Sequence, residues 1–274
     1  MARRNFCEIN PLFYTLSVYK ERMKRHIKNL FSKDKMARVK SDDLLPCVVW
    51  SHSSNMIKRA PGVDLTLQKN KAVNINIAGS AIHKTMIHPG ETFSFWDRVG
   101  KITKRKGYLE GRIIKDNKLI AGMGGGLCNL SNTLHLLILH SPMTVTEFHK
   151  HSDALAPDEG KRVPFAAGTS VGYNYIDYRF RNDTDTAVQL LVWCEEDTLH
   201  AELRSEKDFP CSYELIEEDH RFVKEGEKYY RRSMIYRNIT DRVTGALVNK
   251  ELVLDNRSEV MYDYELIDKS LIKN

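Results

Sequence analysis

The hydrophobic pattern changes along the chain from helical spacing to strand alternation. Apolar side chains near the N-terminus recur at three- and four-residue steps, which predicts an amphipathic helix over residues 11–32 with Asn10 as its cap and Pro11 in its first turn. Similar spacing predicts helices over residues 69–83 and 129–140. The apolar positions of the first helix are Leu12, Leu16, Tyr19, Met23, Ile27 and Leu30, and those of the last are Leu130, Leu134, Leu137 and Ile138.

Alternation with a period of two predicts strands in much of the remaining chain. It is clearest over residues 171–182, where Ile176, Tyr178 and Phe180 alternate with a polar face that carries Asp177. The aromatic segment 92–96 is also strand-like, and its side chains are expected in the core. Hairpins are expected over residues 112–120, with a turn at 115–118, and over residues 187–204. Extended segments are expected over residues 143–152, 228–239 and 246–255. Residues 41–65 are expected to be irregular, and residues 153–169 are expected to form a loop.

These elements predict an α+β fold. A Gly-rich turn leads into a helix that carries a cysteine, and an antiparallel sheet follows, with a basic N-terminal helix and a β-rich C-terminal extension. The predicted division is a basic amphipathic arm over residues 1–40, an α+β domain over 41–210 and a β-hairpin extension over 211–274.

The positive charge is concentrated in the N-terminal arm. Residues 1–40 hold 11 Lys/Arg and 3 Asp/Glu, a net charge of +8, whereas the rest of the chain has a net charge of −2. The body therefore lacks the basic face that a nucleic-acid partner needs. Two interpretations of the helix at 11–32 stay open. It lies on an anionic membrane surface or a partner, or it docks on its own domain with a solvated basic face.

The expected cellular compartment is inferred from the lack of membrane-spanning, secretory and disulfide patterns in the sequence. No apolar run is long enough to span a membrane, and the N-terminus has no apolar core of a secretory signal. The cysteines are odd in number and far apart, which fits neither a disulfide framework nor a zinc ribbon. We expect a cytoplasmic protein, peripheral to the inner membrane face if the arm binds lipid, with no cofactor. The cysteines are Cys7, Cys47, Cys128, Cys194 and Cys211.

The strongest candidate for chemistry is a corner of three glycines, Gly124, Gly125 and Gly126, just before the helix that carries Cys128. Consecutive glycines are costly unless the backbone needs unusual dihedrals or a close approach. Free N–H groups at a helix N-terminus favour a thiolate and could stabilise an oxyanion. No Gly-Lys-Ser/Thr follows, so this is not a phosphate loop of Walker type.

A nucleophilic cysteine needs a base and a group that orients the base. His135 lies about 10 Å along the helix from Cys128, too far to pair with it. His149 and His151 share one side of the next extended segment, and Asp177 lies on the following predicted strand. The order of cysteine, histidine and aspartate is that of papain-like and transglutaminase-like enzymes, by analogy only.

Other interpretations of the corner stay open. It could be a non-catalytic ligand site, or Cys128 could be a small buried hydrophobe beside a tight structural turn. A zinc site formed by Cys128, His149, His151 and His88 is a further alternative, although the spacing fits no common motif and no metal is expected.

Three blocks of sequence resemble the VanW family, which is named for an accessory protein of B-type vancomycin-resistance gene clusters. They are residues 89–96 (PGETFSFW), 124–132 (GGGLCNLSN) and 177–184 (DYRFRNDT), within a resemblance that runs from about residue 70 to 203. The chain departs from the family pattern at Asn129, Phe148 and Gly168, where the family usually has Gln, Arg and Asp. The resemblance implies a link to cell-wall or glycopeptide-resistance biology without an established activity.

Two functions follow as hypotheses. The first is a cysteine-dependent hydrolase or acyl transferase acting on an amide or ester of a peptidoglycan precursor or muropeptide. Cys128 would attack, His151 (or His149) would carry the proton and Asp177 would orient the imidazole. The alternative is a non-catalytic binding module for an anionic cell-envelope precursor at the inner membrane face. The expected ligand-binding residues are Gly124, Gly125, Gly126, Asn129, Ser131 and Asn132.

Overall fold

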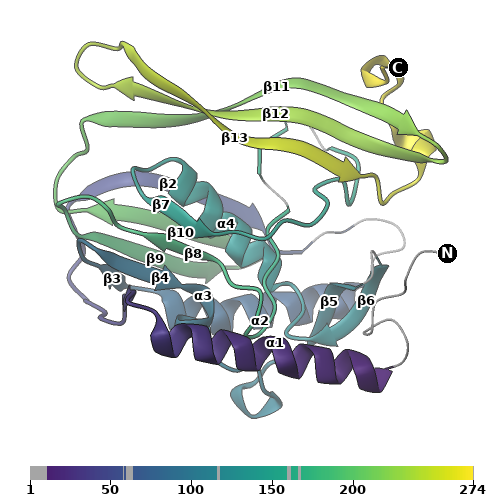
Figure 1. The fold of residues 1–274 in the computed structure, drawn as a ribbon, viewed down its shortest axis with the longest axis horizontal. Coiled ribbons are helices and arrows are strands. Elements are labelled where there is room, and N and C mark those ends of the chain that lie inside the picture. Colours follow the sequence, from purple (N-terminus) through teal and green to yellow (C-terminus); the bar gives the residue numbers. More distant parts are fainter. Residues whose placement is uncertain are drawn as a thin grey trace.

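The computed structural model describes residues 11–57, 59, 64–115, 118–158, 162–165 and 168–273. It confirms the predicted α+β class, since helices lie beside sheets that are almost entirely antiparallel (Figure 1). Asn10, Cys7 and the tip of the turn predicted at 115–118 lie outside the described residues. The helices are α1 (Pro11–Phe31), α2 (Leu65–Ile82), α3 (Phe95–Val99) and α4 (Leu127–Leu139), with 3-10 turns η2 (Lys104–Lys106), η3 (Tyr264–Leu266) and η4 (Lys269–Leu271).

Two four-stranded sheets form the body of the described chain. The first has the order β1-β4-β8-β7 and the second β2-β10-β9-β3. The hairpin predicted over residues 187–204 supplies the two central strands of the second sheet. The strands are β1 (Lys35–Met36), β2 (Cys47–Asn55), β3 (Thr85–Ile87), β4 (Glu91–Ser94), β7 (Thr144–Glu147), β8 (Arg179–Arg181), β9 (Val188–Glu195) and β10 (Thr198–Ser205).

Two smaller antiparallel units complete the fold. The predicted hairpin near residue 115 forms β5 (Glu110–Lys115) and β6 (Lys118–Met123), and it delivers the chain to α4. The C-terminal strands β11 (Cys211–Glu225), β12 (Lys228–Asp241) and β13 (Leu247–Glu259) form a three-stranded sheet that lies above α4 in Figure 1. A small apolar cluster joins this sheet to the body through Leu136, Leu139, Phe165 and Ile235.

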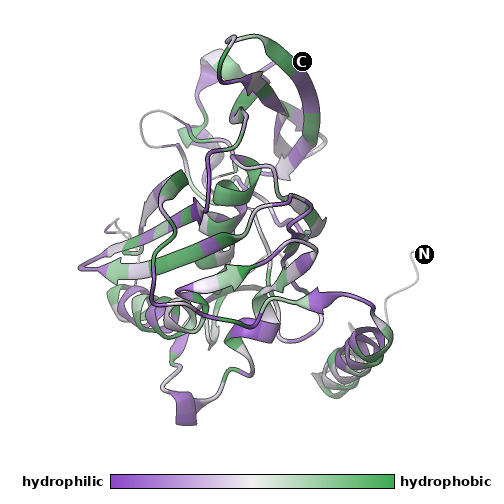
Figure 2. Cartoon of the chain, turned by 90° about the vertical axis from the view of Figure 1, so that its left-hand side faces the viewer, coloured by the Kyte–Doolittle hydropathy of each residue, from purple (hydrophilic) through white to green (hydrophobic). Residues whose placement is uncertain are grey.

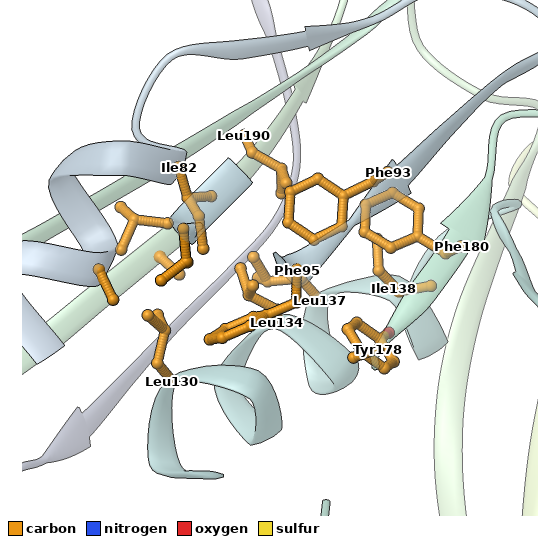
Figure 3. Packing of buried hydrophobic residues seen from close by; sticks show 14 of the residues in the cluster. Ile82, Phe93, Phe95, Leu130, Leu134, Leu137, Ile138, Tyr178, Phe180 and Leu190 are labelled. Atoms are coloured by element: carbon orange, nitrogen blue, oxygen red, sulfur yellow. The ribbon is translucent and has the colours of Figure 1, made fainter. Parts of the chain in front are cut away.

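The main core forms around α4, whose apolar side was predicted from its spacing. Side chains of α4 meet aromatic residues of β4, α3 and β8 (Figure 3). Ile82 of α2 and Leu190 of β9 close the cluster from the other side. The aromatic segment 92–96 therefore packs in the core, as expected. The contributing residues include Leu130, Leu134, Leu137, Ile138, Phe93, Phe95, Tyr178 and Phe180.

Two predictions of local structure are wrong. Residues 47–55 were expected to be irregular, but they form β2, because β10 supplies hydrogen-bond partners from far along the chain. Of the strand predicted over 171–182, β8 contains Arg179–Arg181. The segment before it instead closes a tight turn, in which Gly172 and Ile176 each donate a backbone hydrogen bond to the other.

Helix α1 is present as predicted, but it docks in the reverse of the orientation expected for a helix packed on its own domain. Arg25 is buried and contacts Glu147, whereas the apolar positions of the helix point away from the body. Figure 2 shows α1 nearly end-on at one edge of the molecule. Basic side chains thus hold the helix in place, and its apolar stripe faces outward.

Candidate functional site

The glycine corner exists because backbone segments approach one another closely there. Gly124 and Gly126 have φ angles of 71° and 98°, which side chains rarely tolerate. A Cβ on Gly125 would lie 2.2 Å from the carbonyl carbon of Gly111. Asn74 of α2 fixes this arrangement, because its side-chain nitrogen donates to the carbonyl oxygen of Gly125 at 2.9 Å. Both reasons expected for consecutive glycines are found.

Cys128 lies in the first turn of α4, directly after this corner. Burial raises the pKa of its thiol, although the N–H groups of Val171 and of Cys128 itself, and the charge of Lys71, act in the opposite direction. Desolvation therefore outweighs the helix N-terminus. The sulfur is held mainly as a thiol at neutral pH.

The polar residues of α4 contact neighbouring segments of the protein. Ser131 donates to the carbonyl oxygen of Thr169 at 3.3 Å, and Asn132 accepts from the N–H of Thr169 at 3.0 Å. Asn129 accepts from the hydroxyl of Ser54 at 3.0 Å, which ties α4 to β2. Ser131 and Asn132 are buried, so their first role is to position the chain around Thr169 beside Cys128.

The two predicted bases have other partners. His149 Nε2 lies 2.9 Å from a carboxylate oxygen of Glu147, and the side chain is 42% exposed. His151 Nδ1 lies 2.6 Å from the carbonyl oxygen of Ser152, and burial lowers the pKa of this imidazole. His151 also lines a narrow pocket between the body and the C-terminal sheet.

Asp177, predicted on the polar face of a strand, is fully buried. Its carboxylate accepts hydrogen bonds from the Ser94 hydroxyl at 2.6 Å, the Trp96 N–H at 3.1 Å and the Arg179 guanidinium at 2.7 Å. Within the described chain, no imidazole contacts this carboxylate, so the structure does not bring Cys128, His151 and Asp177 together as a triad. Asp177 instead joins β8 to the start of α3.

His135 is the residue of α4 whose environment the sequence did not reveal. It is 2% exposed, stacks on Phe148 at 4.5 Å and lies 3.2 Å from the hydroxyl of Tyr178 through Nδ1. Its Nε2 has no hydrogen-bond partner among the described residues. Burial lowers the pKa of His135 to about 3, so the ring is neutral. Its seven-residue spacing from Cys128, which places both on one helix face, was the available signal.

A charged cluster beneath α1 was also missed. The Arg25 guanidinium forms a bidentate pair with Glu147 and donates to the carbonyl oxygen of Tyr175. Burial raises the pKa of Glu147, but hydrogen bonds from Arg25 and His149 outweigh that effect and lower it. These residues are far apart in the sequence, so no local pattern could predict the cluster.

The departures from the family pattern have structural counterparts. Phe148 fills space against His135, and Asn129 holds β2. Gly168 has a φ of +118° and accepts a backbone hydrogen bond from His151 at 2.7 Å. A side chain at this position would be strained.

The alternative zinc site is not formed in the described part of the chain. No group of three or more His, Cys, Asp or Glu side chains there is arranged to hold a metal ion. Among the same residues, no helix is both long and apolar enough to cross a bilayer.

Comparison with known proteins identifies the central part of the chain. The family model described as VanW like protein matches residues 70–204. The chain is 26% identical to vancomycin B-type resistance protein VanW of Enterococcus faecalis over 82% of each chain. It is 29% identical to the uncharacterized protein YoaR of Bacillus subtilis, over 54% of this chain and 43% of YoaR. No solved structure gives a significant match. The chain therefore contains a VanW domain over residues 70–204 and is similar to a VanW protein over most of its length.

Proposed function

We propose that this protein is a non-catalytic binding module that recognises an anionic cell-envelope precursor at the Gly124–Cys128 corner. The observation that favours binding over catalysis is that neither the thiol nor the carboxylate of the expected cysteine enzyme is set up for its role. The Cys128 thiol has a raised pKa, and the Asp177 carboxylate is occupied by Ser94, Trp96 and Arg179. Cysteine catalysis requires a thiolate paired with an oriented base.

Positive charge at the corner supports an anionic ligand. Gly126 caps α4 without a side-chain hydrogen bond in the part of the chain described, so the helix begins with N–H groups that no cap side chain covers. Lys71 lies against the same glycine and acts electrostatically on Cys128. A helix N-terminus with a neighbouring lysine attracts phosphate or carboxylate groups.

Hydrogen bonds fix the backbone segment beside Cys128. Ser131 and Asn132 hold the backbone of Thr169, and the N–H of Val171 points at the Cys128 sulfur. A backbone segment that is preorganised in this way lowers the entropy lost on binding. The name of the VanW relative makes glycopeptide-resistance biology the context for such a ligand, so precursors of the cell wall are the first class to test.

Binding can be tested by calorimetry with inorganic pyrophosphate and with a nucleotide-linked muropeptide. We expect Lys71→Gln to weaken binding about fivefold, since a lost ionic contact is worth roughly 1 kcal/mol. Lys69→Gln is the matched control, because Lys69 is an exposed residue of the same helix. Equal effects of the two substitutions, or no binding of either probe, would overturn the proposal.

Substitution of Cys128 distinguishes the binding module from the cysteine-dependent enzyme. We expect Cys128→Ala to bind the precursor as the wild type does, with no product formed by either protein. Alkylation of Cys128, followed by peptide mapping, should accelerate only at alkaline pH because the thiol pKa is raised. Turnover that Cys128→Ala abolishes, or alkylation that is already maximal below neutral pH, would establish the enzyme instead.

A further inference from the structure

Helix α1 carries an apolar stripe that is largely exposed in the described part of the chain. Its members lie at three- and four-residue steps and are between 53% and 80% exposed. From the first to the last member the stripe is about 27 Å long at the α-helical rise. Helices of globular proteins normally turn such a face toward the core. The stripe consists of Leu12, Leu16, Tyr19, Met23, Ile27 and Leu30.

Polar contacts hold the opposite face of the helix against the body. Arg22 Nε donates to the carbonyl oxygen of Tyr173 at 2.6 Å, and its guanidinium lies over the Tyr173 ring. Arg25 pairs with Glu147. Asn29 accepts from Arg179 at 2.8 Å one turn further on. Since these contacts lie along one side of the helix, its outward orientation is determined by the fold.

A row of lysines borders the outward stripe. Lys20, Lys24 and Lys28 follow one another at four-residue steps and are all exposed. The helix has one carboxylate, Glu21, which pairs with Lys24 at 2.6 Å. The exposed surface of α1 thus combines an apolar strip with a positively charged border.

We propose that this surface of α1 docks on an anionic membrane, with the helix lying in the plane of the interface. An apolar face bordered by lysines is the pattern of interfacial helices, which insert apolar side chains while the lysines contact anionic headgroups. A second copy of the chain is a poorer occupant, because face-to-face pairing would bring two lysine rows together. This surface is separate from the Gly124–Cys128 corner, and the proposal does not depend on what binds there.

Flotation of the full chain with lipid vesicles tests the proposal. We expect binding to vesicles of phosphatidylcholine mixed with phosphatidylglycerol, little binding to phosphatidylcholine alone, and weaker binding at high salt. The combined substitution Leu16→Ser, Met23→Ser and Ile27→Ser should reduce partitioning at least about tenfold. Changing the three lysines to Gln should reduce it about tenfold or more at low salt.

A matched control comes from another exposed apolar cluster at the β12–β13 hairpin. Val243, Leu247 and Val248 are 92%, 56% and 61% exposed, and their substitution by Ser should leave partitioning unchanged. Thermal unfolding of each variant checks that the fold is retained. An equal loss in this control, wild-type binding that ignores lipid charge, or no wild-type binding would overturn the proposal. So would light scattering that shows a dimer which the α1 substitutions convert to monomer.

Discussion

Helices α1 and α4 have similar apolar periodicity and opposite environments. In α4, Leu130, Leu134 and Leu137 are completely buried in the main core. In α1, apolar residues at comparable spacing are exposed, whereas Arg25 is buried. The comparison shows that periodicity identifies a helix and its two faces, but not what each face contacts.

The difference has a physical cause in the partners available to each helix. The body offers α4 apolar side chains from both four-stranded sheets, including Phe93 and Leu190. It offers α1 the carboxylate of Glu147 and the backbone carbonyls of Tyr173 and Tyr175. Those acceptors favour the guanidinium groups of α1, and the apolar stripe of the helix is left for another surface.

Truncation in α4 should have the largest effect on stability. Leu134→Ala removes a fully buried side chain and leaves a cavity, so we expect a loss of about 3–4 kcal/mol in the free energy of unfolding. Urea denaturation measures it. The same truncation in α1, Leu16→Ala, should cost less than about 0.5 kcal/mol. Comparable losses in the two helices would break the comparison.

Removal of the ion pair beneath α1 should have the second-largest effect on stability. Arg25→Gln leaves the carboxylate of Glu147 without its main partner, at an expected cost of about 3 kcal/mol to helix docking. Faster hydrogen exchange of α1 amides would report the loss. Lys24→Gln, which breaks an exposed pair, is the control and should change exchange little. Unchanged protection in Arg25→Gln would show that apolar contacts hold the helix.

The buried imidazole of α4 should make the fold sensitive to acid. Burial lowers the pKa of His135 to about 3, against about 6.5 when unfolded, so the unfolded state binds more protons between these values. Its contribution is complete above about pH 6.5 and is lost as the pH falls. At about pH 5 the loss is roughly 2 kcal/mol.

His135→Phe keeps an aromatic ring in this position and removes the titration. The denaturant midpoint should therefore fall less between neutral and acidic pH in the variant than in the wild type. Other buried imidazoles titrate in both proteins, so the difference between the two isolates His135. An identical acid sensitivity would mean that His135 is accessible to protons in the folded protein.

The smallest effect on stability is expected on the outer face of α1. Ile27→Ser changes a side chain that is 53% exposed, so the free energy of unfolding should change by less than about 0.5 kcal/mol. Thermal unfolding of the variant, measured in the absence and in the presence of anionic vesicles, checks this. A large loss in the absence of lipid would show that the stripe packs on the protein itself.

Local sequence was sufficient to predict most helices and hairpins. The three glycines marked a corner where backbones nearly touch, and apolar residues at three- and four-residue steps marked α4. Strand β2 was missed because its partner β10 lies far along the chain. The proposed triad was inferred from the order of residues, whereas the distances between side chains depend on turns such as that at Gly172–Ile176.

The amino-acid sequence by itself determined the α+β class, the family and the two faces of each amphipathic helix, because periodicity and motifs are local properties. Tertiary structure alone decided that Asp177 is enclosed by Ser94, Trp96 and Arg179, and that α1 is held by its arginines. Hydrogen bonds and ion pairs select partners by proximity in space. Such proximity arises only when segments remote in the sequence have packed together.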